Sequence, residues 1–245
     1  MPNLDARVTA QGLGHWFVHD HWLFRDFSFD LVPQHVYAVT GPSGSGKSTL
    51  LSIIAGWLGP SEGTVTRHAD TIRWVFQNPH GVPRRTALDH VALAYIGQGF
   101  KRKDADLAAM DMLTRFHLEG IADSPFAALS GGEAQRLMLA RGLATSPDVF
   151  LIDEPTAQLD RTTADEVNAV MSSLAGQGIV VIATHDPHTR AMCSDVIDLA
   201  GEVAHSDSSE PASNVLGIGA ESEGVSHPAV PSGPDTSSVF AEQST

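Results

Sequence analysis

The chain has 245 residues, 42% of them hydrophobic, and a net charge of −14. This length and apolar content suffice for one large domain or two small ones, and the acidic balance argues against binding to nucleic acid or anionic lipid. A single cysteine excludes an intrachain disulfide and fits a reducing cytosol, and no apolar run reaches the ~18 residues of a membrane span.

The predicted elements alternate between strands and helices. The first thirty residues are rich in aromatics and alternate in polarity, which predicts an antiparallel β portion. A β-prone run at 36–40 and a helix-compatible run at 48–57 follow. Four further runs predict strands, at 72–76, 149–152, 179–183 and 196–199. The last three lack polar alternation, as is typical of parallel strands that are buried on both faces.

A glycine-rich loop joins the strand at 36–40 to its helix and matches the pattern G-x-x-x-x-G-K-[ST]. Its residues are Gly41, Pro42, Ser43, Gly44, Ser45, Gly46, Lys47, Ser48 and Thr49. Glycines let the backbone turn tightly and direct successive N–H groups at phosphate oxygens. Lys47 can reach the β- and γ-phosphates, and Ser48 can offer its hydroxyl to Mg²⁺. The sequence therefore predicts a nucleotide-phosphate site at this helix N-terminus.

Two carboxylates end the predicted strand at 149–152. Asp153 is placed to hold Mg²⁺ directly or through water, because this ion takes few carboxylates and keeps several waters. Glu154, one residue later, can polarise an attacking water. Taken alone, the pair is equally compatible with an ordinary strand end.

Helix-forming residues fill most of 86–130 and predict a helical insert between two strands of the main sheet. At its end, Ser130 and Glu133 have the spacing of a capping box before a helix at 134–143. The cap does not explain Gly131 and Gly132, which allow the close backbone approach that a second phosphate contact needs.

From Gly201 onward the composition shifts to Ser, Gly, Pro and acidic residues. This segment holds seven Asp or Glu residues and no Lys or Arg. It offers too little apolar surface to offset the entropy of ordering. We therefore expect a folded domain at 1–200, with its helical subdomain at about 86–145, and a disordered acidic tail at 201–245.

In their order along the chain, these motifs resemble the nucleotide-binding subunit of an ATP-binding cassette (ABC) transporter. The resemblance covers residues 6–200. Its most specific element is the signature Leu-Ser-Gly-Gly-Glu, formed by Leu129, Ser130, Gly131, Gly132 and Glu133. It implies an α/β fold in which a P-loop NTPase core carries an antiparallel β portion and an inserted helical subdomain, and it implies hydrolysis of ATP with Mg²⁺.

The resemblance assigns roles to single residues. Gln77 matches the Q-loop, which senses Mg²⁺ and the γ-phosphate and lies where the membrane subunit docks. His185 matches the switch histidine at the γ-phosphate, and Glu154 the catalytic base. Phe17 best matches the aromatic residue that stacks on adenine, with Trp16 as the alternative.

Other matches point to a second chain. Residues 129–133 would contact ATP bound by the partner cassette, and Asp160 matches the loop that crosses the dimer interface. Gln158 departs from the residue usual at its place in that loop. The implied assembly pairs this chain with a copy or a related cassette.

The resemblance further implies an integral membrane permease as partner, no nucleic acid, and a cytoplasmic position at the inner face of the membrane. The segment 76–93 resembles bacterial ATPases of lipoprotein or peptide export, with an importer as the alternative. A non-transport ABC ATPase that regulates a membrane or DNA-associated complex is the rival class. A purely regulatory nucleotide binder is disfavoured by the intact Lys47, Asp153, Glu154 and His185.

Overall fold

The computed structural model describes residues 3–200 except 20, 158, 173, 175 and 177. These residues belong to the first of two units into which the chain divides, Met1–Ser206 and Asp207–Thr245. The predicted tail and Gln158 lie outside the described residues, and the proposed domain division stays a prediction.

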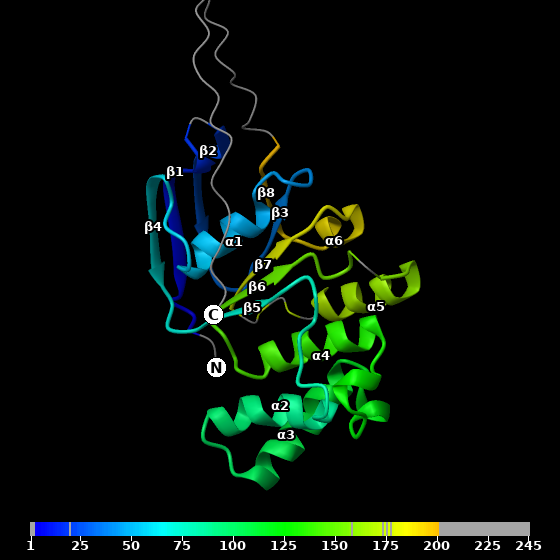
Figure 1. The fold of residues 1–245 in the computed structure, drawn as a ribbon. Coiled ribbons are helices and arrows are strands. Elements are labelled where there is room, and N and C mark those ends of the chain that lie inside the picture. The colour runs from blue at the N-terminus through cyan, green and yellow to red at the C-terminus, as the bar shows by residue number, and fades with distance from the viewer. Residues whose placement is uncertain are drawn as a thin grey trace, which may run out of the picture. The chain divides into compact units, whose positions relative to one another are not determined.

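An antiparallel sheet of three strands forms one layer (Figure 1). Its order is β2 (His21–Leu31), β1 (Arg7–Val18), β4 (Glu62–His68). The antiparallel β portion expected near the N-terminus is thereby confirmed. Strand β4 was not predicted, because its side chains are exposed or only half-buried and leave no apolar run in the sequence.

A parallel sheet of five strands forms the centre of the unit. Its order is β5 (Ile72–Val75), β6 (Val149–Asp153), β7 (Ile179–Ala183), β3 (Val36–Thr40), β8 (Asp195–Asp198). All four neighbouring pairs are parallel. The five predicted strands are confirmed to within one residue at each end. In β3, β6 and β7 every residue is buried, as continuous apolar runs require.

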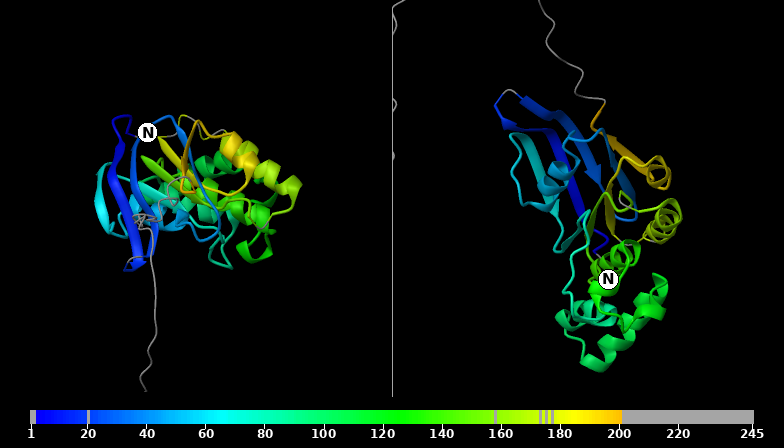
Figure 2. Two further views of the ribbon diagram at one scale, coloured as in Figure 1. Left: turned by 90° about the horizontal axis from the view of Figure 1, so that it is seen from above. Right: turned by 45° about the vertical axis from the view of Figure 1, so that its right-hand side comes forward.

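Helix α1 (Lys47–Ala55) lies between the two sheets (Figures 1 and 2). Leu50, Leu51, Ile53 and Ile54 of α1 are fully buried in a core shared with both sheets. Alternate residues of the central strands face a second core on the opposite side of the sheet, with the helices that follow β5 and β6. The phosphate loop is therefore carried by a helix that is enclosed on two sides.

The remaining helices cover the other face and one end of the parallel sheet. They are α2 (Ala87–Gly97), α3 (Arg102–Arg115), α4 (Gly131–Leu143), α5 (Arg161–Ser172) and α6 (Pro187–Ala191), with 3-10 turns η1 (Glu119–Ile121) and η2 (Phe126–Ala128). The predicted helical insert between β5 and β6 is confirmed. Figure 2 shows α2 and α3 at the end of the unit away from the β1–β2 turn. No helix in the described part of the chain has the length and apolarity to cross a membrane.

Candidate functional site

The phosphate loop turns through left-handed glycines into helix α1. Gly44 has a φ of 82°, and Gly46, the N-cap of α1, has a φ of 94°. A Cβ atom on Gly46 would also lie 2.9 Å from the Phe24 ring. Glycine is thus required here both for backbone conformation and for space. No side chain caps the N-terminus of α1, so its N–H groups remain available to an anion.

A cavity of about 820 Å³ opens over this loop. It gathers side chains from the antiparallel sheet, the phosphate loop and the segments that follow β5, β6 and β7. The lining residues are Phe17, Leu23, Pro42, Ser43, Gly44, Gly46, Lys47, Ser48, Thr49, Gln77, Glu154 and His185. Residues predicted from separate motifs therefore share one site. Gly41 and Ser45 belong to the loop but do not line this cavity; a Cβ atom on Gly41 would lie 2.5 Å from Ser45 Oγ.

Three charged or polar side chains meet at the cavity floor. The Lys47 ammonium donates to the carbonyls of Gly41 and Pro42 at 3.1 and 3.3 Å, and it lies 3.3 Å from Glu154 Oε1. The other Glu154 oxygen lies 2.8 Å from His185 Nδ1. One carboxylate therefore connects the phosphate-loop lysine to the histidine after β7.

Glu154 adopts a left-handed conformation with a φ of 44°, which is unusual for a residue with a side chain. Its N–H group donates to the carbonyl of Ala183 at 2.9 Å, which holds the backbone at the ends of β6 and β7. Strained backbone of this kind clusters at functional sites. Here it turns the carboxylate toward Lys47 and His185.

Asp153 lies under the loop and has the features of a cation ligand. It is 7% exposed, and its Oδ1 has no hydrogen-bond partner within the described part of the chain. The Ser48 hydroxyl hydrogen-bonds to this carboxyl group, and burial, opposed by that bond, raises the pKa of Asp153. A buried carboxylate with a spare oxygen beside a hydroxyl suits a hard cation such as Mg²⁺.

Phe17 and Trp16 point to opposite sides of β1. Phe17 lines the cavity and is 68% exposed. Trp16 packs edge-on against Trp22, with ring centroids 4.3 Å apart. Of the two candidates for the aromatic that stacks on adenine, only Phe17 borders the phosphate cavity.

The signature residues do not line this cavity. Ser130 and Glu133 form the predicted capping box of α4, with Ser130 N–H donating to Glu133 Oε2 at 2.8 Å. Hydrogen bonds from Ser130 lower the pKa of Glu133. Leu129 packs against the helical core. Within this chain the segment is therefore a capped helix N-terminus that lies apart from the phosphate loop.

The two signature glycines have different surroundings. A Cβ atom on Gly132 would overlap Thr163 of α5, whereas on Gly131 it would meet only Leu159 at 3.8 Å. Gly132 thus has a packing role that its sequence did not reveal. Thr163 also donates through its hydroxyl to Asp160 at 2.7 Å, and its hydrogen bonds lower the pKa of Asp160.

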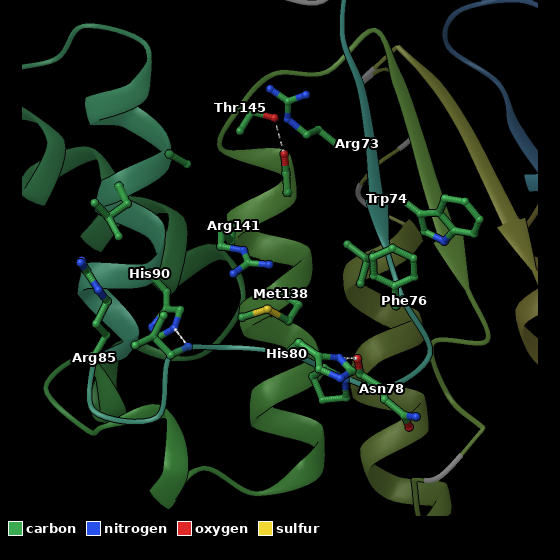
Figure 3. Close-up of a pocket in the computed structure, with 16 residues that line it drawn as sticks. Arg73, Trp74, Phe76, Asn78, His80, Arg85, His90, Met138, Arg141 and Thr145 are labelled. Carbon is green, nitrogen blue, oxygen red and sulfur yellow. Dashed lines mark hydrogen bonds between the residues drawn. The ribbon is translucent and has the colours of Figure 1, made fainter. Parts of the chain in front are cut away.

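A second hollow, of about 450 Å³, lies between β5 and α4 next to the segment that follows Gln77 (Figure 3). Trp74 and Phe76 border one side, and Arg141 and Met138 of α4 the other. The other charged or titratable side chains in its lining are Arg73, His80, Arg85 and His90. We call this hollow the β5–α4 groove. Its lining contains no Asp or Glu, although the chain is acidic overall.

His90 fixes the rim of the β5–α4 groove. Its Nε2 accepts from Val82 N–H at 2.9 Å, and its Nδ1 lies 2.8 Å from the Thr86 carbonyl oxygen. Burial lowers the pKa of His90, and the neutral ring supplies the acceptor that Val82 needs. Sequence reasoning missed this groove, and also Leu23 in the cavity. The segment 76–93 was singled out only for its resemblance. Trp74, Met138 and Arg141 belong to no motif, and only the fold brings them beside that segment.

Comparison with known proteins agrees with this geometry. Residues 24–157 match the family model described as ABC transporter. The chain is 37% identical over 171 residues to the lipoprotein-releasing system ATP-binding protein LolD of Chromohalobacter salexigens, covering 61% of this chain and 71% of that protein. It is 34% identical over 212 residues to the taurine import ATP-binding protein TauB of Pseudomonas aeruginosa, covering 81% of each.

A solved structure is similar as well. It is the dimer of an ATP-binding cassette in a post-hydrolysis state bound to ADP and Pi. The match has a TM-score of 0.68 at 28% identity and covers 79% of this chain and 94% of the other. The predicted P-loop α/β fold is confirmed. With its sequence matches, its sheet order and its phosphate cavity, the chain belongs to the ABC transporter family as an ATP-binding, ATP-hydrolysing cassette.

Proposed function

We propose that this ATPase binds Mg²⁺ and ATP in the cavity over α1 and works as one of two paired cassettes that energise a separate membrane permease. The observation that carries the proposal is the convergence of Lys47, Ser48, Gln77, Glu154 and His185 on one cavity. These residues come from four separate segments, and each has the chemistry that phosphoryl transfer to water needs.

Lys47 and the loop N–H groups would bind the phosphates. The ammonium now interacts with two carbonyls and with Glu154, and a phosphate oxygen is a stronger partner for it than a carbonyl. The N–H groups at the N-terminus of α1 add a fixed positive potential. Phe17 offers its exposed face to the base.

Ser48 and Asp153 would hold Mg²⁺, with Gln77 beside it. Among the described residues, no group of three or more His, Cys, Asp or Glu side chains is arranged to hold a metal ion, so the ion would complete its shell with phosphate oxygens and water. When bound, Mg²⁺ neutralises charge that develops on the phosphate oxygens. The spare oxygen of buried Asp153 fits this use.

Glu154 would accept the proton of the attacking water, and His185 would position the γ-phosphate. The 2.8 Å contact between His185 Nδ1 and Glu154 keeps both groups at the end of the sheet where the phosphates bind. A carboxylate within reach of the water, oriented by a neighbouring side chain, is the usual arrangement for a general base.

The segment 129–133 would act on ATP held by the other cassette, with Asp160 at the interface. This segment lies outside the chain's own cavity, and its capping box uses the N–H groups of Ser130 and Glu133, so those of Gly131 and Gly132 would be the ones to meet a phosphate. A solved relative is a dimer, which supports pairing with a copy or a related chain.

The β5–α4 groove is the proposed docking site of the permease. It continues from Gln77, and its arginines and aromatics suit a short amphipathic helix that carries carboxylates. Docking there would hold the cassette at the cytoplasmic face of a membrane. The named relatives act in lipoprotein release and in taurine import, so the export-type resemblance stays a prediction.

Copurification tests this function. The chain would be co-expressed with the multi-span membrane protein of a neighbouring gene and purified in detergent through a tag on that protein. We expect the wild type and the control Arg115→Glu to copurify, and Arg85→Glu, which reverses one charge of the groove, to be lost while its own ATPase activity remains. Equal recovery of Arg85→Glu would contradict the docking site. No recovery of the wild type would favour the non-transport alternative.

A further inference from the structure

His15 lies on β1 two residues before Phe17, and both side chains face the same side of the strand. The His15 side chain is buried, with 5% of the residue exposed, although imidazole is polar. Neighbouring Trp16 points the other way, toward Trp22. A buried histidine directly beneath an exposed aromatic of the cavity needs an explanation that the phosphate chemistry does not give.

Ring contacts extend from His15 in two directions. Its ring meets Phe17 edge-on, with centroids 4.8 Å apart at an interplanar angle of 85°. On the other side it lies 6.4 Å from Phe24, and Phe24 is the ring that closes over Gly46. The series Gly46–Phe24–His15–Phe17 therefore connects the phosphate loop to the aromatic side chain that lines the cavity.

Ser61 fixes the orientation of the His15 ring. The His15 Nδ1 lies 3.2 Å from Ser61 Oγ, and that oxygen also accepts from Trp16 N–H at 3.2 Å. Ser61 N–H donates to the carbonyl of Gly14 at 2.9 Å. The ring is thus tied to the backbone on both sides of its own position. Its buried Nε2 has no hydrogen-bond partner among the described residues, and burial lowers the pKa of His15.

We propose that His15 is a positioning residue that holds the Phe17 ring in the orientation from which it stacks on the base of ATP. This inference rests on the proposed role of Phe17. An aromatic side chain that is 68% exposed gains little orientation from its own surroundings, and the edge-on contact with a fixed ring restricts it before the nucleotide binds. Such preorganisation raises affinity by lowering the entropy lost on binding.

The pKa of His15, which burial lowers, favours the neutral ring and agrees with this role. A neutral imidazole is a compact aromatic ring that packs on Phe17 and Phe24, whereas a charged ring would bring a cation into an apolar layer. Among the described residues, nothing hydrogen-bonds to Nε2, which does not fit a histidine kept for hydrogen bonding alone. It fits one kept for its ring and for the single bond to Ser61 that sets the ring plane.

The test compares dissociation constants of the full chain for Mg·ATP and for Mg·tripolyphosphate, which has the phosphates without the base. We expect His15→Ala to weaken ATP binding about 3- to 10-fold, the scale of one aromatic pair, with tripolyphosphate binding and kcat unchanged. His15→Phe, which keeps a ring, should retain near wild-type ATP affinity, and His15→Leu, which fills the volume without a ring, should not. Trp16→Ala is the matched control and should leave both constants unchanged.

The outcomes distinguish a failure of the positioning role of His15 from a failure of the proposed base-stacking role of Phe17. Adding His15→Ala to Phe17→Ala should cause no further loss, since both changes remove the same platform. Unchanged ATP affinity in Phe17→Ala would overturn the role of Phe17 itself. A normal affinity in both His15→Ala and His15→Leu, with a weakened Phe17→Ala, would overturn only the positioning role. Equal weakening for ATP and tripolyphosphate would assign His15 to general support of the loop and would also overturn it.

Discussion

The phosphate loop and the signature segment are two glycine-containing helix N-termini built in different ways. At α1 no side chain caps the helix, and the loop opens into a cavity together with Glu154 and His185. At α4 the Ser130–Glu133 capping box satisfies the N-terminus, and none of its residues borders that cavity. The first site is assembled within one chain, whereas the second is a capped helix end that lies outside the phosphate cavity of its own chain.

The largest effect on ATPase activity is expected from a substitution in the phosphate loop. Lys47→Ala removes the ammonium that lies among the loop carbonyls and Glu154, and ATPase activity should fall by about 10³-fold or more, because the phosphates lose their cationic partner in a confined site. ATP affinity should fall as well. Purified Lys103→Ala, which removes an exposed lysine of α3, should match the wild type. Near-normal turnover of Lys47→Ala would contradict the site.

Glu154→Gln tests whether the phosphate loop of one chain pairs with the signature segment of a second copy. The amide keeps the size of the side chain but cannot accept the proton of water, so hydrolysis should slow by about 10²-fold while ATP binding persists. With both sites loaded, size-exclusion chromatography should show a closed dimer. Glu119→Gln, at an exposed turn, is the control. A variant that stays monomeric at saturating Mg·ATP would indicate that the partner cassette is a different chain.

The smallest of the three effects on ATPase activity tests whether Ser130 only caps helix α4 or also contacts the nucleotide of the partner cassette. Ser130 and Thr86 both cap helices through their hydroxyls, accepting from Glu133 and Asp89 N–H. Ser130→Ala and Thr86→Ala should each cost about 0.5–2 kcal/mol of stability, seen as a lower Tm. Only Ser130→Ala should also reduce ATPase activity, by about tenfold, through the loss of a charge-assisted hydrogen bond to the partner's nucleotide. Equal activities would leave the segment 129–133 with a structural role alone.

Features of the fold that are encoded by a few neighbouring residues could be predicted from the sequence, whereas features that depend on contacts between distant residues could not. The strand at 36–40, the glycine loop and the capping box carry their signals within a few neighbouring residues, and the structure has them where we expected. Strand β4 was not predicted from the sequence, because it is defined by pairing with β1 across about fifty residues of chain. The packing of Gly132 against Thr163 is likewise a contact between helices, and nothing near Gly132 in the sequence indicates it.

The same limit applies inside the site. The motifs predicted that Lys47, Glu154 and His185 act together, but not that the carboxylate of Glu154, a residue with a left-handed backbone, contacts both of the others. The choice between Phe17 and Trp16 also stayed open, because β1 contains register shifts near both residues, and alternation in a shifted strand does not fix which face a side chain takes.

The burial of α1 on two sides has a mechanical consequence. A helix whose Leu50, Leu51, Ile53 and Ile54 are all fully enclosed has no free side toward which it can tilt without opening one of two close-packed layers. We therefore expect the phosphate loop to keep its position relative to both sheets when a nucleotide binds. Helices α2 and α3 pack against α4 and not against the antiparallel sheet, so we expect that a change in their position would disturb fewer layers than a tilt of α1.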